Sequence, residues 1–302
     1  MNFSEYTLVS FGDSFTFGED TVPKPDFGET VDKKLEKKYI EECNNNSYTQ
    51  FLAENLGFKD SINFGLLGAS NDRSMMLLES FLRSNPKKKV FIIFNFTNSL
   101  RYVQFLKVDG EKKYDIIDMA PTFEDWKTEN RHPYTGINSK TVAQNWTFFR
   151  NSIQDVYNHI KQRRAVYYIL SSYNVPYITF DGINDVDARM LRDNPLQYIN
   201  KDKIDGCYGN FLYNDDENYI FKEQDFLNSY YEELVNETPL LNHLTIKDMK
   251  QNVNLLSYIS SLGNSHNGDV DHYISNYGIH WNIDGHMEVA ILLYKFINER
   301  YN

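Results

Sequence analysis

Short apolar segments alternate with longer amphipathic segments along much of this chain, and this alternation constrains its fold more than any other feature. The apolar runs are rich in β-branched and aromatic residues, as buried strands are. We expect strands at residues 6–11, 61–64, 90–94 and 175–180, and helices at 48–56, 72–83 and 142–173. Strands separated by helices pair in parallel through right-handed crossovers. The sequence therefore predicts a three-layer α/β/α fold with a central parallel sheet.

Two stretches exceed what such a sheet requires. We expect residues 1–302 to form one α/β domain with two insertions. The first, 101–138, begins with alternating residues and a turn signal that predict a hairpin. The second, 184–265, is acidic and aromatic, with helical spacing at 225–235 and 246–262. We interpret this second insertion as a cap, because loops beside a rigid scaffold often select substrates.

The first predicted strand ends in the turn Gly12-Asp13-Ser14. A serine at this point lies at the carboxyl edge of the sheet, where open α/β sheets bind ligands. The ordinary alternative is a turn that starts a helix, since Asp and Ser both cap helices well. We expect Asp13 to be such a local cap rather than a catalytic group, because adjacent side chains diverge.

A histidine near the other end of the chain, His280, stands just before a predicted closing helix. Apolar residues recur there at helical spacing, and Asn282 or Asp284 can cap the helix. A loop histidine before a helix can be presented to a cleft. The alternative is a histidine that only caps or packs.

Together, these two blocks resemble the SGNH/GDSL hydrolase family. The later block matches the family pattern at His280, Asn282, Gly285, His286 and Ala290. The resemblance implies that Ser14 is a catalytic nucleophile and that His280 is its base.

The resemblance also implies three donors to an oxyanion hole. They are the backbone N–H of Ser14, the backbone N–H of Gly68 in the block 63–71, and the side chain of Asn98 after the third strand. Such donors stabilise the negative oxygen of a tetrahedral intermediate. The third block departs from the family, with Phe96-Thr97-Asn98-Ser99 in place of Gly-x-Asn-Asp.

The acid of the family's catalytic triad has no counterpart at its usual place. Tyr277 stands three residues before His280, and a tyrosine cannot supply the negative charge that orients the imidazole. Other acids in the same region are Asp269, Asp271 and Asp284. Three interpretations remain open: a Ser–His dyad held by a backbone carbonyl, another acid in the missing role, or a degenerate site.

These residues predict a serine hydrolase that cleaves a carboxylic ester. An O-acetyl group on a carbohydrate is one candidate substrate, because the chain is 15% aromatic and aromatic faces stack on sugars. The alternative explanation of the aromatic content is that these rings fill the core. The alternative is a catalytically degenerate binding or structural protein of the same fold. A flavodoxin-like nucleotide binder fits less well, because the first turn lacks the glycines that cradle phosphate.

Composition limits the partners. The net charge of −11 disfavours nucleic acid and anionic membranes, and no apolar run approaches the roughly 20 residues of a membrane helix. We expect a small-molecule or glycan ester as partner, no cofactor, and no metal, since His-x-x-x-His and Cys-x-x-Cys spacings are absent.

The expected location is cytoplasmic or virion-associated. No secretory signal is seen, and two distant cysteines, Cys43 and Cys207, fit a reducing compartment. The serine turn and an AT-rich composition resemble bacteriophage-encoded SGNH-type hydrolases. The oligomeric state stays open.

Overall fold

The structure of the chain is a computed structural model. It describes residues 1–25, 32–97, 101–107, 114–119, 152–182, 242–244, 246–248, 251–253, 255, 258–259, 262, 272–274 and 280–301. None of the helices in this part of the chain is long and apolar enough to cross a membrane.

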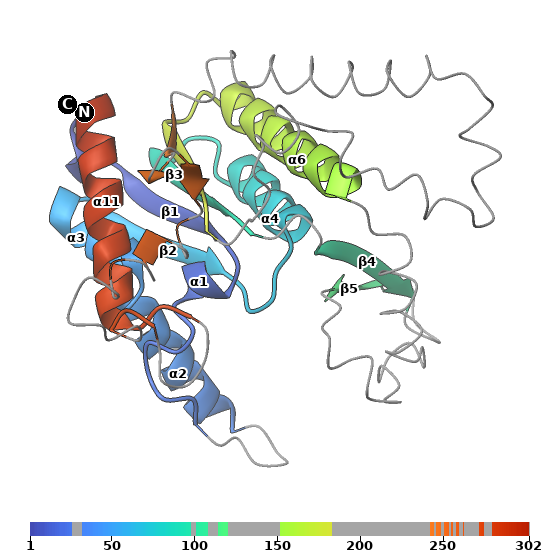
Figure 1. Cartoon of the computed structure of the whole chain (residues 1–302), viewed down its shortest axis with the longest axis horizontal. Coiled ribbons are helices and arrows are strands. Elements are labelled where there is room, and N and C mark those ends of the chain that lie inside the picture. Colours follow the sequence, from blue (N-terminus) through green and yellow to red (C-terminus); the bar gives the residue numbers. More distant parts are fainter. Residues whose placement is uncertain are drawn as a thin grey trace.

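A five-stranded sheet forms the centre of the fold, and every neighbouring pair of strands in it is parallel. Its order is β2-β1-β3-β6-β7, so the first strand lies inside the sheet (Figure 1). The strands are β1 (Thr7–Gly12), β2 (Asp60–Gly65), β3 (Val90–Phe96), β6 (Tyr177–Asp181) and β7 (His243–Leu244). Since parallel strands share one carboxyl edge, the turns after β1, β2 and β3 meet there.

Helices cover both faces of this sheet (Figure 1). They are α1 (Ser14–Phe17), α2 (Lys33–Asn45), α3 (Tyr48–Leu56), α4 (Asn71–Ser84), α6 (Ser152–Ser172) and α11 (Ile283–Tyr301), and a 3-10 turn, η1 (Phe3–Glu5), opens the chain. The helices α3 and α11 pack on one face and α4 and α6 on the other.

The strand side chains alternate between two buried clusters. Leu8 and Phe91 face α3 and α11, whereas their neighbours Val9 and Ile92 face α4 and α6. This period of two is what a strand buried on both faces requires. The three-layer α/β/α fold predicted from the sequence is thus confirmed.

The predicted hairpin is also present, as β4 (Tyr102–Lys107) and β5 (Tyr114–Met119) pair in antiparallel fashion. The predicted helix at 246–262 is wrong in its first part, because β8 (Ile246–Asp248) and β9 (Gln251–Val253) form a small antiparallel pair. Cross-strand pairing there overrides the helical spacing.

The helical spacing holds further along, at Leu255, Tyr258, Ile259 and Leu262, which are helical and pack against the core. The helix predicted at 225–235 and most of the region interpreted as a cap lie outside the described residues.

The two ends of the chain lie side by side. The amino group of Met1 donates to the carbonyl oxygen of Tyr301 at 2.5 Å, and Figure 1 shows both termini at one end of α11. This closure places the start of α11 near the carboxyl edge of β1.

Candidate active site

The serine turn is a short, tightly bonded helix start. Asp13 caps α1, because its carboxylate accepts a hydrogen bond from the Phe15 N–H at 3.1 Å. Ser14 follows directly and is almost fully buried. Gly18 ends the helix at φ 88°, and its N–H donates to the Ser14 carbonyl at 3.1 Å. The capping role predicted for Asp13 is confirmed, and Ser14 stands at the carboxyl end of β1.

His280 is held by the residues on its C-terminal side. Trp281 is fully buried, and its ring packs against that of Phe15, which also contacts the His280 ring. Asn282 caps α11 by accepting from the Gly285 N–H at 2.9 Å. Asn282 and Asp284 were both predicted as possible caps, and Asn282 is the residue that caps α11. These contacts fix the backbone on one side of the imidazole.

The serine and the histidine meet across 266 residues of sequence. Ser14 Oγ lies 2.8 Å from His280 Nε2, and His280 Nδ1 lies 2.9 Å from Asp20 Oδ2. In the tautomer that such a pairing requires, Nδ1 carries the ring proton and its N–H donates a hydrogen bond to the Asp20 carboxylate. The lone pair of Nε2 is then free to accept from the Ser14 hydroxyl, which is the arrangement of a Ser–His–acid triad.

Asp20 is the site residue that sequence reasoning missed. It lies in the turn that follows α1, six residues after Ser14, whereas the family pattern directed attention to the residues before His280. Its backbone has φ 66°, a left-handed conformation that few residues other than Gly, Asn and Asp adopt. Thr21 fixes this turn, since its N–H and hydroxyl both donate to the Gly18 carbonyl. An acid placed just after a glycine that ends a helix was the available signal.

The acids that the sequence suggested near His280 are not described in contact with its ring. Asp284 is exposed in the first turn of α11, while Asp269, Asp271 and Tyr277 lie outside the described residues. The position opposite Nδ1 is taken by Asp20. Because this carboxylate comes from the N-terminal block, an Asp three residues before the histidine is not needed to hold the ring.

A second carboxylate approaches the other ring nitrogen. Glu19 Oε2 lies 3.4 Å from His280 Nε2, on the same side as Ser14. Two consecutive acids therefore flank one imidazole, one at each nitrogen.

The loop after β2 carries Gly68, the second expected oxyanion donor. Gly68 has φ 68°, in a turn closed by the Ala69 N–H donating to Leu66 O at 3.1 Å. The Leu66 N–H in turn donates to Gly12 O at 3.1 Å, which ties this loop to the serine turn. The third expected donor, Asn98, lies outside the described residues.

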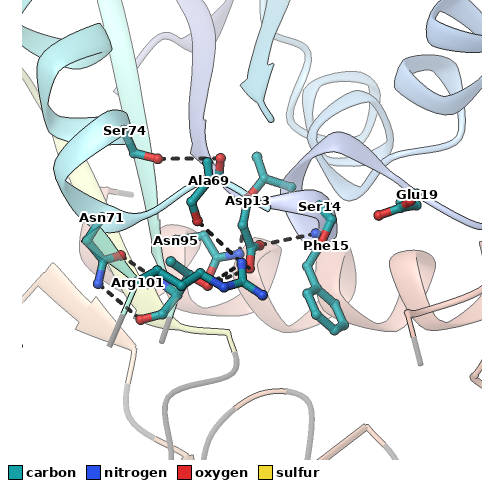
Figure 2. A network of polar contacts seen from close by, with 12 residues as sticks. Asp13, Ser14, Phe15, Glu19, Ala69, Asn71, Ser74, Asn95 and Arg101 are labelled. Atoms are coloured by element: carbon teal, nitrogen blue, oxygen red, sulfur yellow. Dashed lines mark hydrogen bonds and ion pairs between the residues drawn. The ribbon is translucent and has the colours of Figure 1, made fainter. Parts of the chain in front are cut away.

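A buried polar network joins the serine turn to the neighbouring loops (Figure 2). The Asp13 carboxylate accepts from the Thr97 hydroxyl at 2.6 Å and pairs with Arg101 Nη1 at 3.2 Å, which also donates to Ala69 O at 3.3 Å. Asn71 holds Thr97 through both backbone groups, at 2.8 and 3.0 Å. Asp13 and Arg101 thus connect three segments. They are the serine turn, the loop that carries Gly68, and Thr97, which follows β3 just before Asn98.

His286, from the same block as His280, is buried behind the site. Its Nδ1 accepts from the Tyr48 N–H at 3.1 Å, and burial lowers the pKa of His286 to about 3, with a smaller contribution from the charge of His280. The folded protein therefore keeps this imidazole neutral where an unfolded chain, with a pKa near 6.5, would protonate it. Its role is structural.

The protonation of His286 makes stability depend on pH. Because the folded pKa is depressed, the unfolded state binds the extra proton below pH 6.5, and the free energy of unfolding falls as the pH is lowered. We expect wild type to lose about 2 kcal/mol more than H286N between pH 7 and pH 5. Asn keeps an acceptor for Tyr48 but does not titrate. Urea unfolding at both pH values measures this, and equal losses in the two proteins would contradict it.

Asp181, the acid at the carboxyl end of β6, lies beside two basic side chains. Asp181, at the end of β6, forms an ion pair with Arg163 and lies 3.5 Å from His159 Nε2. Among the described residues, no group of three or more His, Cys, Asp or Glu side chains is arranged to hold a metal ion. Asp181 thus makes local ion pairs.

The fold and the Ser–His–Asp arrangement together have the form typical of α/β serine hydrolases. No protein-family profile and no curated protein sequence matches the chain. Solved structures of similar fold include a lipolytic protein of the G-D-S-L family from Desulfitobacterium hafniense DCB-2, with 11% identity, TM-score 0.41 and coverage of 96% of this chain and 98% of that one.

Two further structures carry related titles. The psychrotrophic esterase EstA from a Pseudoalteromonas species has 9% identity and TM-score 0.40, with 97% of each chain covered. The lipase/acylhydrolase from Enterococcus faecalis has 10% identity and TM-score 0.36, with 98% of this chain and 96% of that chain covered.

Proposed function

We propose that this protein is a serine ester hydrolase with Ser14 as nucleophile, His280 as general base and Asp20 as the acid that orients His280. One observation carries the proposal: Ser14 Oγ lies 2.8 Å from Nε2 of a ring whose Nδ1 lies 2.9 Å from a carboxylate. A serine hydroxyl becomes an effective nucleophile only with a base within hydrogen-bond reach.

Acylation would begin when Ser14 Oγ attacks the ester carbonyl while His280 Nε2 takes the hydroxyl proton. The new C–O bond leaves a negative oxygen on the tetrahedral intermediate. The imidazolium formed at the same time is stabilised by the Asp20 carboxylate at Nδ1. Collapse of the intermediate breaks the bond to the alcohol, which leaves with the proton from Nε2.

Deacylation would repeat the same steps with water. His280 takes a proton from a water molecule as its oxygen attacks the acyl carbon, and the proton then returns to Ser14 Oγ as the carboxylic acid departs. The negative oxygen of each intermediate would be bound by the N–H groups of Ser14 and Gly68 and by the Asn98 amide. One such donor is typically worth about 3 kcal/mol in the transition state.

The competing hypothesis, a degenerate binding protein, was motivated by Tyr277 at the position of the family's acid. It predicts a folded protein that resists a serine-directed probe. Asp20 lies in hydrogen-bond contact with Nδ1, which favours the hydrolase over the degenerate alternative.

We propose that the substrate is a small ester. A more specific proposal is that this ester is an O-acetylated carbohydrate. The more specific proposal is supported by the aromatic content of 15% alone. Release of acetate from O-acetylated sugars, compared with release from simple alkyl acetates, would separate the two.

A fluorophosphonate probe tests the nucleophile directly. We expect a single adduct on Ser14, located by peptide mass spectrometry, and turnover of 4-nitrophenyl acetate by the unlabelled protein. S14A is the control and should show neither. S4A, which removes a surface serine hydroxyl at η1, should behave like wild type. Folded wild-type protein that resists the probe and does not hydrolyse the ester would overturn the proposal.

A further inference from the structure

Glu19 occupies a position that the proposed chemistry does not use. Its backbone N–H donates to the Ser14 carbonyl at 3.1 Å, so the residue is fixed to the serine turn. Its side chain is 17% exposed, and Oε2 reaches within 3.4 Å of His280 Nε2. Figure 2 shows Glu19 beside the end of α1 that carries Ser14. Asp20 already holds the ring at Nδ1, so orienting His280 does not require Glu19.

The distance to Nε2 places Glu19 near the departing alcohol. In the proposed mechanism the leaving oxygen takes its proton from Nε2. The leaving oxygen and Nε2 then lie about 3 Å apart, as a hydrogen bond requires. Glu19 Oε2 is 3.4 Å from the same nitrogen. The carboxylate and the leaving oxygen are therefore separated by no more than about 6.5 Å, which is shorter than the screening length of about 8 Å at physiological salt.

Among the described residues, two acids, Glu19 and Asp20, bring their charges to the His280 ring. Glu19 pairs with Lys24, whose Nζ lies 3.9 Å from Oε1 on a side chain that is more than half exposed, and exposed pairs of this kind are weak. Asp20 adds a second negative charge at the ring. Arg101 is engaged by Asp13, on the side of the oxyanion loops.

We propose that Glu19 is a specificity-determining residue that makes the leaving-group side of the site favour positively charged alcohols over neutral ones, and neutral over negatively charged ones. The inference rests on the proposed function, because it takes the proton on Nε2 to be the one given to the alcohol. The charge on Glu19 attracts a cation on the alcohol as the ester bond breaks and repels an anion.

Three acetate esters test this, because they share the acyl group and differ in the charge of the alcohol. They are acetylcholine, its uncharged analogue 3,3-dimethylbutyl acetate, and the acetate ester of 3-hydroxypropanoate. We expect wild type to show a kcat/KM for acetylcholine about tenfold above that for the neutral analogue, because opposite charges within a screening length attract each other. E19Q should bring the two values together and raise the relative rate of the anionic ester.

The control variant is E5Q, which removes one negative charge at an exposed ion pair with Lys89, away from the site. It should leave the wild-type ratios unchanged. A wild-type ratio of acetylcholine to the neutral analogue near or below one would overturn the inference, as would E19Q with wild-type ratios. Absence of Ser14-dependent turnover of all three esters would instead remove the proposed function, and the inference would fall with it.

Discussion

Replacement of Asp20 by Asn should lower kcat for 4-nitrophenyl acetate by about 10³- to 10⁴-fold. The amide is neutral, so it cannot stabilise the imidazolium that forms when His280 takes the Ser14 proton. Its NH₂ group can also donate to Nδ1, which moves the ring proton to Nε2, where it faces Ser14 and blocks proton transfer. Asn tolerates the φ of 66° as well as Asp does, so the backbone of the turn is preserved.

The matched control for this variant is D284N. Asp284 is an exposed acid only four residues from His280 in sequence, and its loss should change kcat by less than threefold. Both variants should melt within a few degrees of wild type, as measured by circular dichroism. If D20N retained activity within threefold of wild type, the acid of the triad would have to be a residue other than Asp20.

Gly65→Ala should lower the free energy of unfolding by about 3 kcal/mol or more. Gly65 ends β2 directly beneath α1, and a Cβ there would lie 2.2 Å from the backbone nitrogen of Phe17 and 2.6 Å from the carbonyl carbon of Thr16. These are backbone atoms that cannot rotate away, so α1 would have to move off the sheet. Ser14 stands at the start of α1, so fluorophosphonate labelling should slow as well.

Gly57→Ala is the control, because it changes a glycine that has no close neighbour. Gly57 has φ 69°, and no atom lies within 4 Å of its added Cβ, so only the strain of the left-handed backbone should appear, about 1 kcal/mol. Urea unfolding of both variants measures the difference. Equal stability of G65A and G57A would show that α1 is not seated on Gly65 as described.

The strands and helices were predictable because their signals are local. Continuous apolar runs rich in β-branched and aromatic residues marked β1 and β3, helical apolar spacing marked α4, and Gly57 marked the end of α3. The hairpin of β4 and β5 followed from alternation. The pairing of β8 with β9 was not predicted, since short strands are selected by their cross-strand partner rather than by their own spacing.

Part of the site was also predictable. The contact between Ser14 and His280 was implied by the resemblance of two motifs to one hydrolase family, and Asp13 as a cap follows from residue type. The network through Arg101 was not predictable, because its partners Asp13, Thr97 and Ala69 come from three separate loops.

By itself, the sequence determined that a parallel sheet would present Ser14 at its carboxyl edge, because a strand, a turn and a helix are encoded by neighbouring residues. It also determined that His280 would precede a closing helix. Only the tertiary structure decided which acid meets the imidazole. The left-handed backbone at Asp20 and the packing of Trp281 against Phe15 bring that carboxylate to Nδ1 and place Glu19 at Nε2. Local spacing can mark an acid after a helix-ending glycine, but it does not encode which distant side chain that acid will meet.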